Sequence, residues 1–221
     1  MRERNTTYYC IDTPGKSTAF LHQSVETSYR TGCRQMVLIE PDREILELVE
    51  LFENANVYVV VPTIESARRN NIPARVHTVI WNWETDDLAA ALLANGYDMT
   101  RKGLFIWIGR SSYFRKETIG EIIRSLAVVA ADGSALVMDY IDEGLAASPS
   151  RRMTAAVALE AATGKAVRST FTYASLELLL EKFGFIIYEQ LTAEAAGRFG
   201  GAEQQAMAYS CTAYVHAVWK G

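Results

Sequence analysis

Short apolar runs recur along this chain of 221 residues, and segments with a helical pattern separate most of them. The runs that predict buried strands cover residues 35–39, 57–61, 76–81, 104–108 and 134–139. The segments that place apolar residues at helical spacing cover residues 42–54, 85–95, 117–130 and 175–183. Strands that alternate with helices in this way predict an α/β fold with a mostly parallel sheet.

Two further apolar runs, residues 185–188 and 211–219, lie near the C-terminus. The connection between them is rich in glycine, with Gly197, Gly200 and Gly201, and reads as a loop. Consecutive strands that are joined by a loop instead of a helix pair in the antiparallel sense. We therefore expect the sheet to end in an antiparallel hairpin.

The size of the chain favours one domain over residues 1–221, because 221 residues that are 49% hydrophobic can bury a sizeable core. Within this domain, residues 1–31 are interpreted as a short N-terminal lid and helix segment. Residues 144–170, which are rich in alanine at their start, are interpreted as a helical insertion.

Charge and apolar run length exclude several classes of partner. The net charge is −4, and the lysines and arginines are dispersed, so no basic stripe for nucleic acid is expected. The longest apolar runs are much shorter than the roughly 20 residues that cross a bilayer. The N-terminus is polar and contains no signal core. We expect a cytoplasmic protein that contacts neither nucleic acid nor membrane.

Cysteine and histidine spacing gives no support to a metal site. The residues concerned are Cys10, Cys33, Cys211, His22, His77 and His216. They lie far apart and form no C-x-x-C or H-x-x-x-H pattern, so neither a disulfide framework nor a zinc site is predicted.

Several motifs together resemble the leucine carboxyl methyltransferase-like group of S-adenosylmethionine (SAM) enzymes. They occur in the family's order at residues 32–38 (GCRQMVL), 80–87 (IWNWETDD), 104–113 (LFIWIGRSSY) and 184–185 (GF). Asn82 takes the place of a family aspartate, and Ile108 takes the place of a family glutamate. The resemblance covers the chain from about residue 17 to the C-terminus. It implies the Rossmann-like class I methyltransferase fold.

The cofactor motifs of that group are degenerate here. Where the family has a glycine-rich turn after the first strand, this chain has Glu40, Pro41 and Asp42. Their bulk and negative charge would oppose the carboxylate of SAM, since like charges about 4 Å apart repel by about 4 kcal/mol at an effective dielectric near 20. The second strand ends in valines and lacks the acid that the family uses for ribose. We therefore expect no cofactor, with SAM as the alternative.

The candidate catalytic residues are polar side chains that follow predicted strands, together with one histidine. Glu40 and Asp42 follow the first strand, where open α/β sheets place ligands, although acids also stabilise a solvated helix N-terminus. His22 is a candidate general acid or base because histidine is the usual residue for that role, although a lone histidine on a helix is more often structural. Tyr113 lies in the turn after the fourth strand and completes the candidate catalytic set.

Candidate binding residues surround the same strand ends. Those assigned to the substrate are Trp83, Trp107, Arg110, Ser111, Ser112 and Tyr140. The tryptophans offer faces for stacking, although both also suit a core position. Tyr140 either donates a hydrogen bond to a ligand or caps the sheet. Asn82 is the candidate cofactor-binding residue if SAM is bound.

The expected function is that of a methyltransferase-like enzyme that has lost SAM dependence. It would catalyse a cyclisation, rearrangement or isomerisation of a small organic substrate by holding it in a reactive conformation, plausibly in specialised metabolism. One alternative is a SAM-dependent O-methyltransferase with a divergent pocket, and a second is a non-catalytic partner protein. The short N-terminal segment leaves either an open pocket or one that a partner subunit closes, as in a homodimer.

Overall fold

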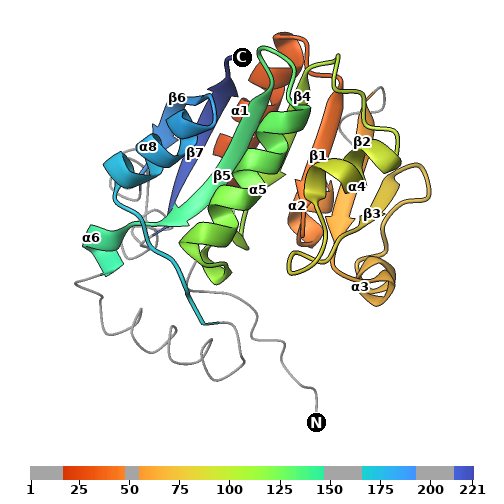
Figure 1. The fold of residues 1–221 in the computed structure, drawn as a ribbon, viewed down its shortest axis with the longest axis horizontal. Coiled ribbons are helices and arrows are strands. Elements are labelled where there is room, and N and C mark those ends of the chain that lie inside the picture. The colour runs from red at the N-terminus through yellow and green to blue at the C-terminus, as the bar shows by residue number, and fades with distance from the viewer. Residues whose placement is uncertain (1–16, 48–54, 147–165, 193–211) are drawn as a thin grey trace.

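A seven-stranded sheet forms the centre of the molecule in the computed structural model, which describes residues 17–47, 55–146, 166–192 and 212–221 (Figure 1). Its strand order is β3-β2-β1-β4-β5-β7-β6. The strands are β1 (Gln35–Ile39), β2 (Asn56–Val61), β3 (His77–Ile80), β4 (Gly103–Trp107), β5 (Ala135–Ile141), β6 (Phe185–Leu191) and β7 (Thr212–Trp219). Every strand predicted from the apolar runs is present.

Strands β1 to β5 pair in parallel with their neighbours in the sheet, whereas β7 runs in the opposite direction. β7 lies between β5 and β6 and pairs antiparallel with both. The expected antiparallel ending is therefore confirmed, and the α/β Rossmann-like fold with a mostly parallel sheet is confirmed with it. The glycines of the expected connection, Gly197, Gly200 and Gly201, lie outside the described residues.

Helices cover both faces of the sheet. The helices are α1 (Ser17–Arg30), α2 (Arg43–Glu47), α3 (Ile64–Arg69), α4 (Leu88–Ala94), α5 (Lys116–Val129), α6 (Glu143–Ala146) and α8 (Tyr173–Lys182), and a short 3₁₀ turn, η2, covers Ser111–Tyr113. The helices α4, α5 and α8 pack on one face and α1 and α2 on the other. The result is a three-layer arrangement (Figure 1).

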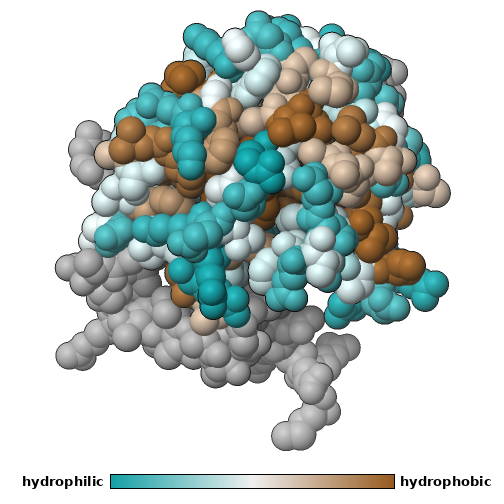
Figure 2. Space-filling view, in the orientation of Figure 1, coloured by the Kyte–Doolittle hydropathy of each residue, from teal (hydrophilic) through white to brown (hydrophobic). Residues whose placement is uncertain are grey.

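Two cores result from the alternation of side chains along the buried strands. In β1, Val37 and Ile39 face the core under α4, α5 and α8, while Met36 and Leu38 face the core under α1. The outer surface of the layer formed by α4, α5 and α8 mixes hydrophilic and apolar side chains (Figure 2).

Helix α4 begins three residues later than the predicted segment. The side chain of Asp87 accepts a hydrogen bond from the Ala90 amide at 2.9 Å and so caps the helix. The preceding residues form a turn instead, because the Asp86 carboxylate accepts from the Asn82 amide at 2.9 Å. Local side-chain hydrogen bonds of this kind compete with helical backbone bonds.

The expected N-terminal segment and insertion are described only in part. In the N-terminal segment, α1 is the expected helix, and residues 1–16 lie outside the described residues. α6 begins the expected insertion, residues 147–165 lie outside the described residues, and residues 166–170 are not helical. Phe171 then joins the end of β5, because its amide donates to the Ile141 carbonyl at 2.9 Å. In the described part of the chain, no helix is long and apolar enough to cross a membrane.

Candidate functional site

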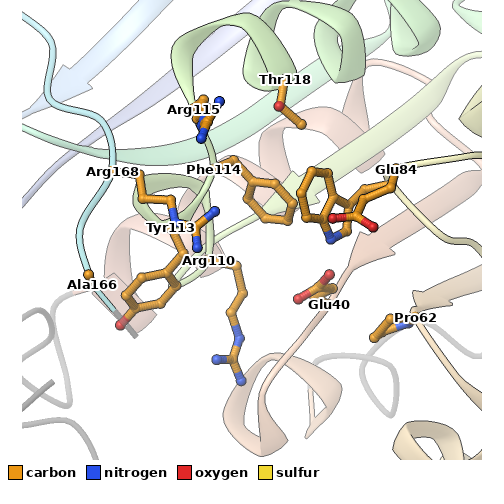
Figure 3. Close-up of a pocket in the computed structure, with 11 residues that line it drawn as sticks. Glu40, Pro62, Glu84, Arg110, Tyr113, Phe114, Arg115, Thr118, Ala166 and Arg168 are labelled. Atoms are coloured by element: carbon orange, nitrogen blue, oxygen red, sulfur yellow. The ribbon is translucent and has the colours of Figure 1, made fainter. Parts of the chain in front are cut away.

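A cavity of about 630 Å³ opens at the carboxyl ends of β1, β2 and β4 (Figure 3). It is lined by Glu40, Pro62, Trp83, Glu84, Arg110, Tyr113, Phe114, Arg115, Thr118, Ala166 and Arg168. The carboxyl ends of parallel strands are where open α/β sheets bind ligands. The volume is within the range of about 300–1,000 Å³ that is usual for small-molecule sites.

A second cavity of about 370 Å³ adjoins the first. It extends toward α3 and is lined by Glu40, Pro41, Val61, Pro62, Ser66, Arg69, Asn70 and Arg110. The two cavities share Glu40, Pro62 and Arg110, so these three residues form a common wall.

Glu40 has an unusual backbone at the point where β1 ends. Its φ angle is 44°, in the left-handed region that favours glycine. The amide of Glu40 donates to the Val60 carbonyl at 2.9 Å, which holds the residue beside β2. Burial raises the pKa of the Glu40 carboxyl, and the positive charge of Arg110 opposes that rise.

The turn after β4 is built on buried serines. The hydroxyl of Ser111 donates to the carbonyl of Asp139 at 2.7 Å and lies 3.0 Å from its carboxylate Oδ1. The carbonyl of Ser112 accepts hydrogen bonds from the amides of Arg168 and Ser169 at 2.8 and 3.2 Å. These bonds connect β4, β5 and residues 166–169, and they bring Arg168 to the cavity.

An aromatic cluster forms one wall of the larger cavity. The ring of Phe114 meets Trp83 at 5.6 Å and Trp107 at 5.5 Å, both edge to face. Trp83 is partly exposed, whereas Trp107 is fully buried beneath Phe114. The indole Nε1 of Trp107 has no hydrogen-bond partner within the described ranges.

Charges of both signs face the larger cavity. In the view of Figure 3, the carboxylates of Glu40 and Glu84 lie toward Pro62, and Tyr113 and Arg168 lie on the opposite side. Among the described residues that line the cavity, Arg110, Arg115 and Arg168 outnumber the two glutamates. The cavity therefore suits a ligand with both cationic and anionic groups.

Four of the residues predicted from the sequence meet in this cavity. They are Glu40 and Tyr113 from the catalytic set and Trp83 and Arg110 from the substrate set. Their approach depends on the parallel register of β1 and β4, in which Leu38 pairs with Ile106. This register brings the residues that follow both strands to one edge of the sheet.

Three other predicted residues lie elsewhere or shape the backbone. The Asp42 carboxylate accepts a hydrogen bond from the Ile45 amide at 2.9 Å at the start of α2. His22 is exposed on α1, which covers the opposite face of the sheet from α5. The Asn82 side chain accepts from the Glu84 amide at 3.0 Å and so stabilises the loop that presents Trp83.

Four predicted substrate residues are buried and lie outside the cavity lining. Ser111 and Ser112 hold the turn after β4, and Trp107 supports Phe114. Tyr140 accepts a hydrogen bond from the Gln190 amide group at 2.6 Å, and burial raises its pKa to about 12. None of the four lines either cavity.

The sequence prediction missed several residues of the cavity wall, of which Phe114, Arg115, Glu84 and Arg168 carry the most chemistry. Phe114 and Glu84 directly follow candidate residues, and Arg115 lies two residues after Tyr113, so a wider window around each turn would have included all three. Arg168 had no sequence signal, because its position depends on the backbone bond to Ser112. Among the described residues, no group of three or more His, Cys, Asp and Glu side chains is arranged to hold a metal ion.

Comparisons with other proteins identify the class of fold. No protein-family model matches the chain. A Bacillus subtilis protein, YktD, which carries the provisional name of an S-adenosyl-L-methionine-dependent methyltransferase, is 28% identical over 94% of this chain and 73% of its own length. The chain has the fold of the class I SAM-dependent methyltransferases, and the resemblance to the leucine carboxyl methyltransferase-like group stays a prediction.

Solved structures show the same fold at low sequence identity. A DUF574 family protein from Streptomyces avermitilis superposes with a TM-score of 0.64, at 17% identity over 90% of this chain and 80% of that one. The 1,6-didemethyltoxoflavin-N1-methyltransferase of Burkholderia thailandensis superposes with a TM-score of 0.58, at 12% identity over 95% of this chain and 80% of that one. That structure contains its substrate and S-adenosylhomocysteine.

These comparisons contradict the expected SAM-independent cyclase or isomerase, and with it the expected absence of a cofactor. Similarity to a protein named as a SAM-dependent methyltransferase extends over nearly the whole chain. The missing glycines after β1 did not indicate loss of SAM, and the reason is physical. Glu40 takes the backbone conformation that a glycine would take, and Gly109, with φ 77°, has open space where a Cβ would be.

Proposed function

We propose that this chain is a SAM-dependent methyltransferase that methylates a small organic molecule. The observation that carries the proposal is the pair of joined cavities at the carboxyl ends of β1, β2 and β4, in a chain with the methyltransferase fold. The similarity to YktD supports the same activity.

The residues present fit the cofactor. Gly109 leaves open space after the end of β4, and Glu40, in its left-handed conformation after β1, lines both cavities. SAM carries a carboxylate, an ammonium, a sulfonium and a ribose. The arginines that line the cavity offer cations for the carboxylate, while Glu40 and Glu84 offer hydrogen-bond acceptors and negative charge.

When bound, SAM supplies an electrophilic methyl group on a sulfonium. The chain then has to place the acceptor in line with that methyl and exclude water, and correct placement alone supplies much of the rate. Trp83 and Phe114 provide an apolar wall for this purpose. Tyr113 lies on the opposite side of the cavity in Figure 3, where its hydroxyl orients the acceptor.

We propose that the acceptor is an anion such as a carboxylate. Arg115 and Arg168 both line the larger cavity, and guanidinium groups bind carboxylates through paired hydrogen bonds. An anionic acceptor attacks without losing a proton, so it requires no general base. This agrees with the positions of His22 and Asp42, which line neither cavity.

We infer that the chain is a divergent member of the leucine carboxyl methyltransferase-like group, on the order of its motifs. A homodimer and a cytoplasmic location remain predictions. Size-exclusion chromatography with light scattering measures the first directly.

Titration calorimetry of the full chain with S-adenosylhomocysteine tests the proposed function. We expect micromolar binding with one site per chain. Lack of binding at millimolar ligand would overturn the proposal. As a control, the same titration with adenosine monophosphate should show much weaker binding, because that molecule has no amino-acid end.

A further inference from the structure

The common wall of the two cavities indicates which part of an extended ligand it contacts. A ligand that extends through both cavities contacts Glu40, Pro62 and Arg110, because these residues line both. If the proposed function is correct, that ligand is SAM, in which the ribose lies between the adenine and the methionine. The common wall therefore faces the ribose.

Ribose hydroxyls need an acceptor at this wall. Arg110 can only donate hydrogen bonds, and the ring of Pro62 offers no polar group. The Glu40 side chain is an acceptor with two oxygens, which suits two neighbouring hydroxyl groups. Glu40 is thus the side chain of the common wall with the required chemistry.

The end of β2 offers no carboxylate for this task. Its last residues, Val59, Val60 and Val61, are apolar and fully buried. Ile39 pairs with Val60 in the parallel register, so Glu40 follows at the level of Val61 on the neighbouring strand. A carboxylate from β1 thereby reaches the cavity beside the end of β2.

The backbone at Glu40 supports a functional role for its side chain. A left-handed conformation is unfavourable for a residue with a Cβ, and glycine would adopt it without cost. Such outliers persist only where the surrounding structure enforces them, and they cluster at active sites and ligand sites. Burial of the carboxyl adds a second unfavourable term, which a ligand that donates hydrogen bonds would reduce.

We propose that Glu40, supplied by the end of β1, holds the ribose hydroxyls of SAM. This inference rests on the proposed function, and it gives Glu40 a binding role in place of the catalytic role expected from the sequence. The competing role for Glu40 is purely structural, as the partner of the Arg110 charge.

A double-mutant cycle, in which both the protein and the ligand are changed, separates a ribose-binding role of Glu40 from a structural role. Calorimetry would measure S-adenosylhomocysteine and its 2′-deoxy and 3′-deoxy analogues against the wild-type chain and Glu40→Gln. Hydrogen bonds to a charged group predict that Glu40→Gln weakens binding of the parent ligand about 10- to 100-fold. The deoxy analogues should lose most of this sensitivity. Glu84→Gln, in the same cavity, is the matched control and should affect parent and analogues equally.

The outcomes are distinct. Equal weakening of parent and deoxy ligands by Glu40→Gln would overturn the inference and leave the proposed function intact, as would an unchanged affinity. Absence of binding to the wild-type chain would overturn both. If Glu40→Gln does not fold, the wild-type titrations still decide, because deoxy analogues that bind as tightly as the parent would exclude a held ribose.

Discussion

At the scale of single residues, Glu40 combines a backbone suited to glycine with a carboxylate that faces both cavities. Stability and binding should therefore respond in opposite directions when this residue is changed. The sequence identified Glu40 as important, but it suggested that the residue blocks a cofactor. Its backbone conformation and the nearby charge of Arg110 support the opposite interpretation.

Replacement Glu40→Gly should stabilise the fold and weaken cofactor binding. Relief of the left-handed strain is worth about 1 kcal/mol, and loss of the carboxylate removes the proposed ribose contact. Urea denaturation measures the first effect and calorimetry with S-adenosylhomocysteine measures the second. Glu40→Ala is the control, since it keeps a Cβ and should show the loss of binding without the gain in stability. A Glu40→Gly variant that binds more tightly than wild type would contradict this account.

His216 of β7 is buried against α1 and should make the free energy of unfolding depend on pH. The Nε2 atom of His216 lies 3.3 Å from the Ser28 hydroxyl, which itself donates to the Ser24 carbonyl. His216 Nε2 therefore carries the hydrogen, while Nδ1 is buried without a partner among the described residues. Burial lowers the pKa of His216 to about 4.

Because the unfolded chain binds this proton near pH 6.5, stability should fall as the pH drops from 6.5 toward 4. A shift of this size corresponds to up to about 3 kcal/mol at the lower end of the window. Urea denaturation at pH 7.5, 6, 5 and 4 measures the slope. His216→Gln removes the titrating group and should flatten that part of the slope, whereas His22→Gln, on the exposed side of α1, should leave it unchanged. Equal slopes for wild type and His216→Gln would contradict the prediction.

At the scale of elements, capping determined where helices begin, and turns determined which side chains reach the site. The apolar runs predicted all strands, most clearly β1, β4 and β5, which are buried on both faces of the sheet. The edge strands β3 and β6 are partly exposed. The helix before β4 was predicted to begin too early, because Asp86 and Asp87 favour a turn and a cap. Periodicity reports the face of a helix more reliably than its ends.

The substitution Asp87→Ala removes the N-terminal cap of α4. It should lower the free energy of unfolding by about 1 kcal/mol, because the Ala90 amide then loses its acceptor. Urea denaturation of the full chain measures the change. Asp132→Ala, an exposed acid in a turn, is the control and should remain within about 0.5 kcal/mol of wild type. An unchanged stability for Asp87→Ala would show that packing alone holds α4.

At the scale of the whole molecule, cofactor binding should stabilise all layers together, because the cavities lie where β1, β2 and β4 end. Ligand at 100 times its dissociation constant adds about 2.7 kcal/mol to folding. For a chain of 221 residues this corresponds to a rise in Tm of roughly 5–10 °C.

Thermal denaturation with and without S-adenosylhomocysteine measures this rise. Glu40→Gln should show a smaller rise at the same ligand concentration, and Asp87→Ala should show the full rise from a lower starting Tm. A wild-type Tm that does not respond to saturating ligand would contradict the proposed cofactor.

The order of apolar runs by itself determined the α/β class, the strands and the antiparallel ending, because burial in a parallel sheet requires continuous apolar segments and these are visible in one dimension. The motif order also indicated the methyltransferase fold. Only the tertiary structure decided the site. Strand register brought Glu40 beside the end of β2, and a backbone bond to Ser112 brought Arg168 to the same cavity. Such contacts join residues that are distant in sequence, and no local pattern records them.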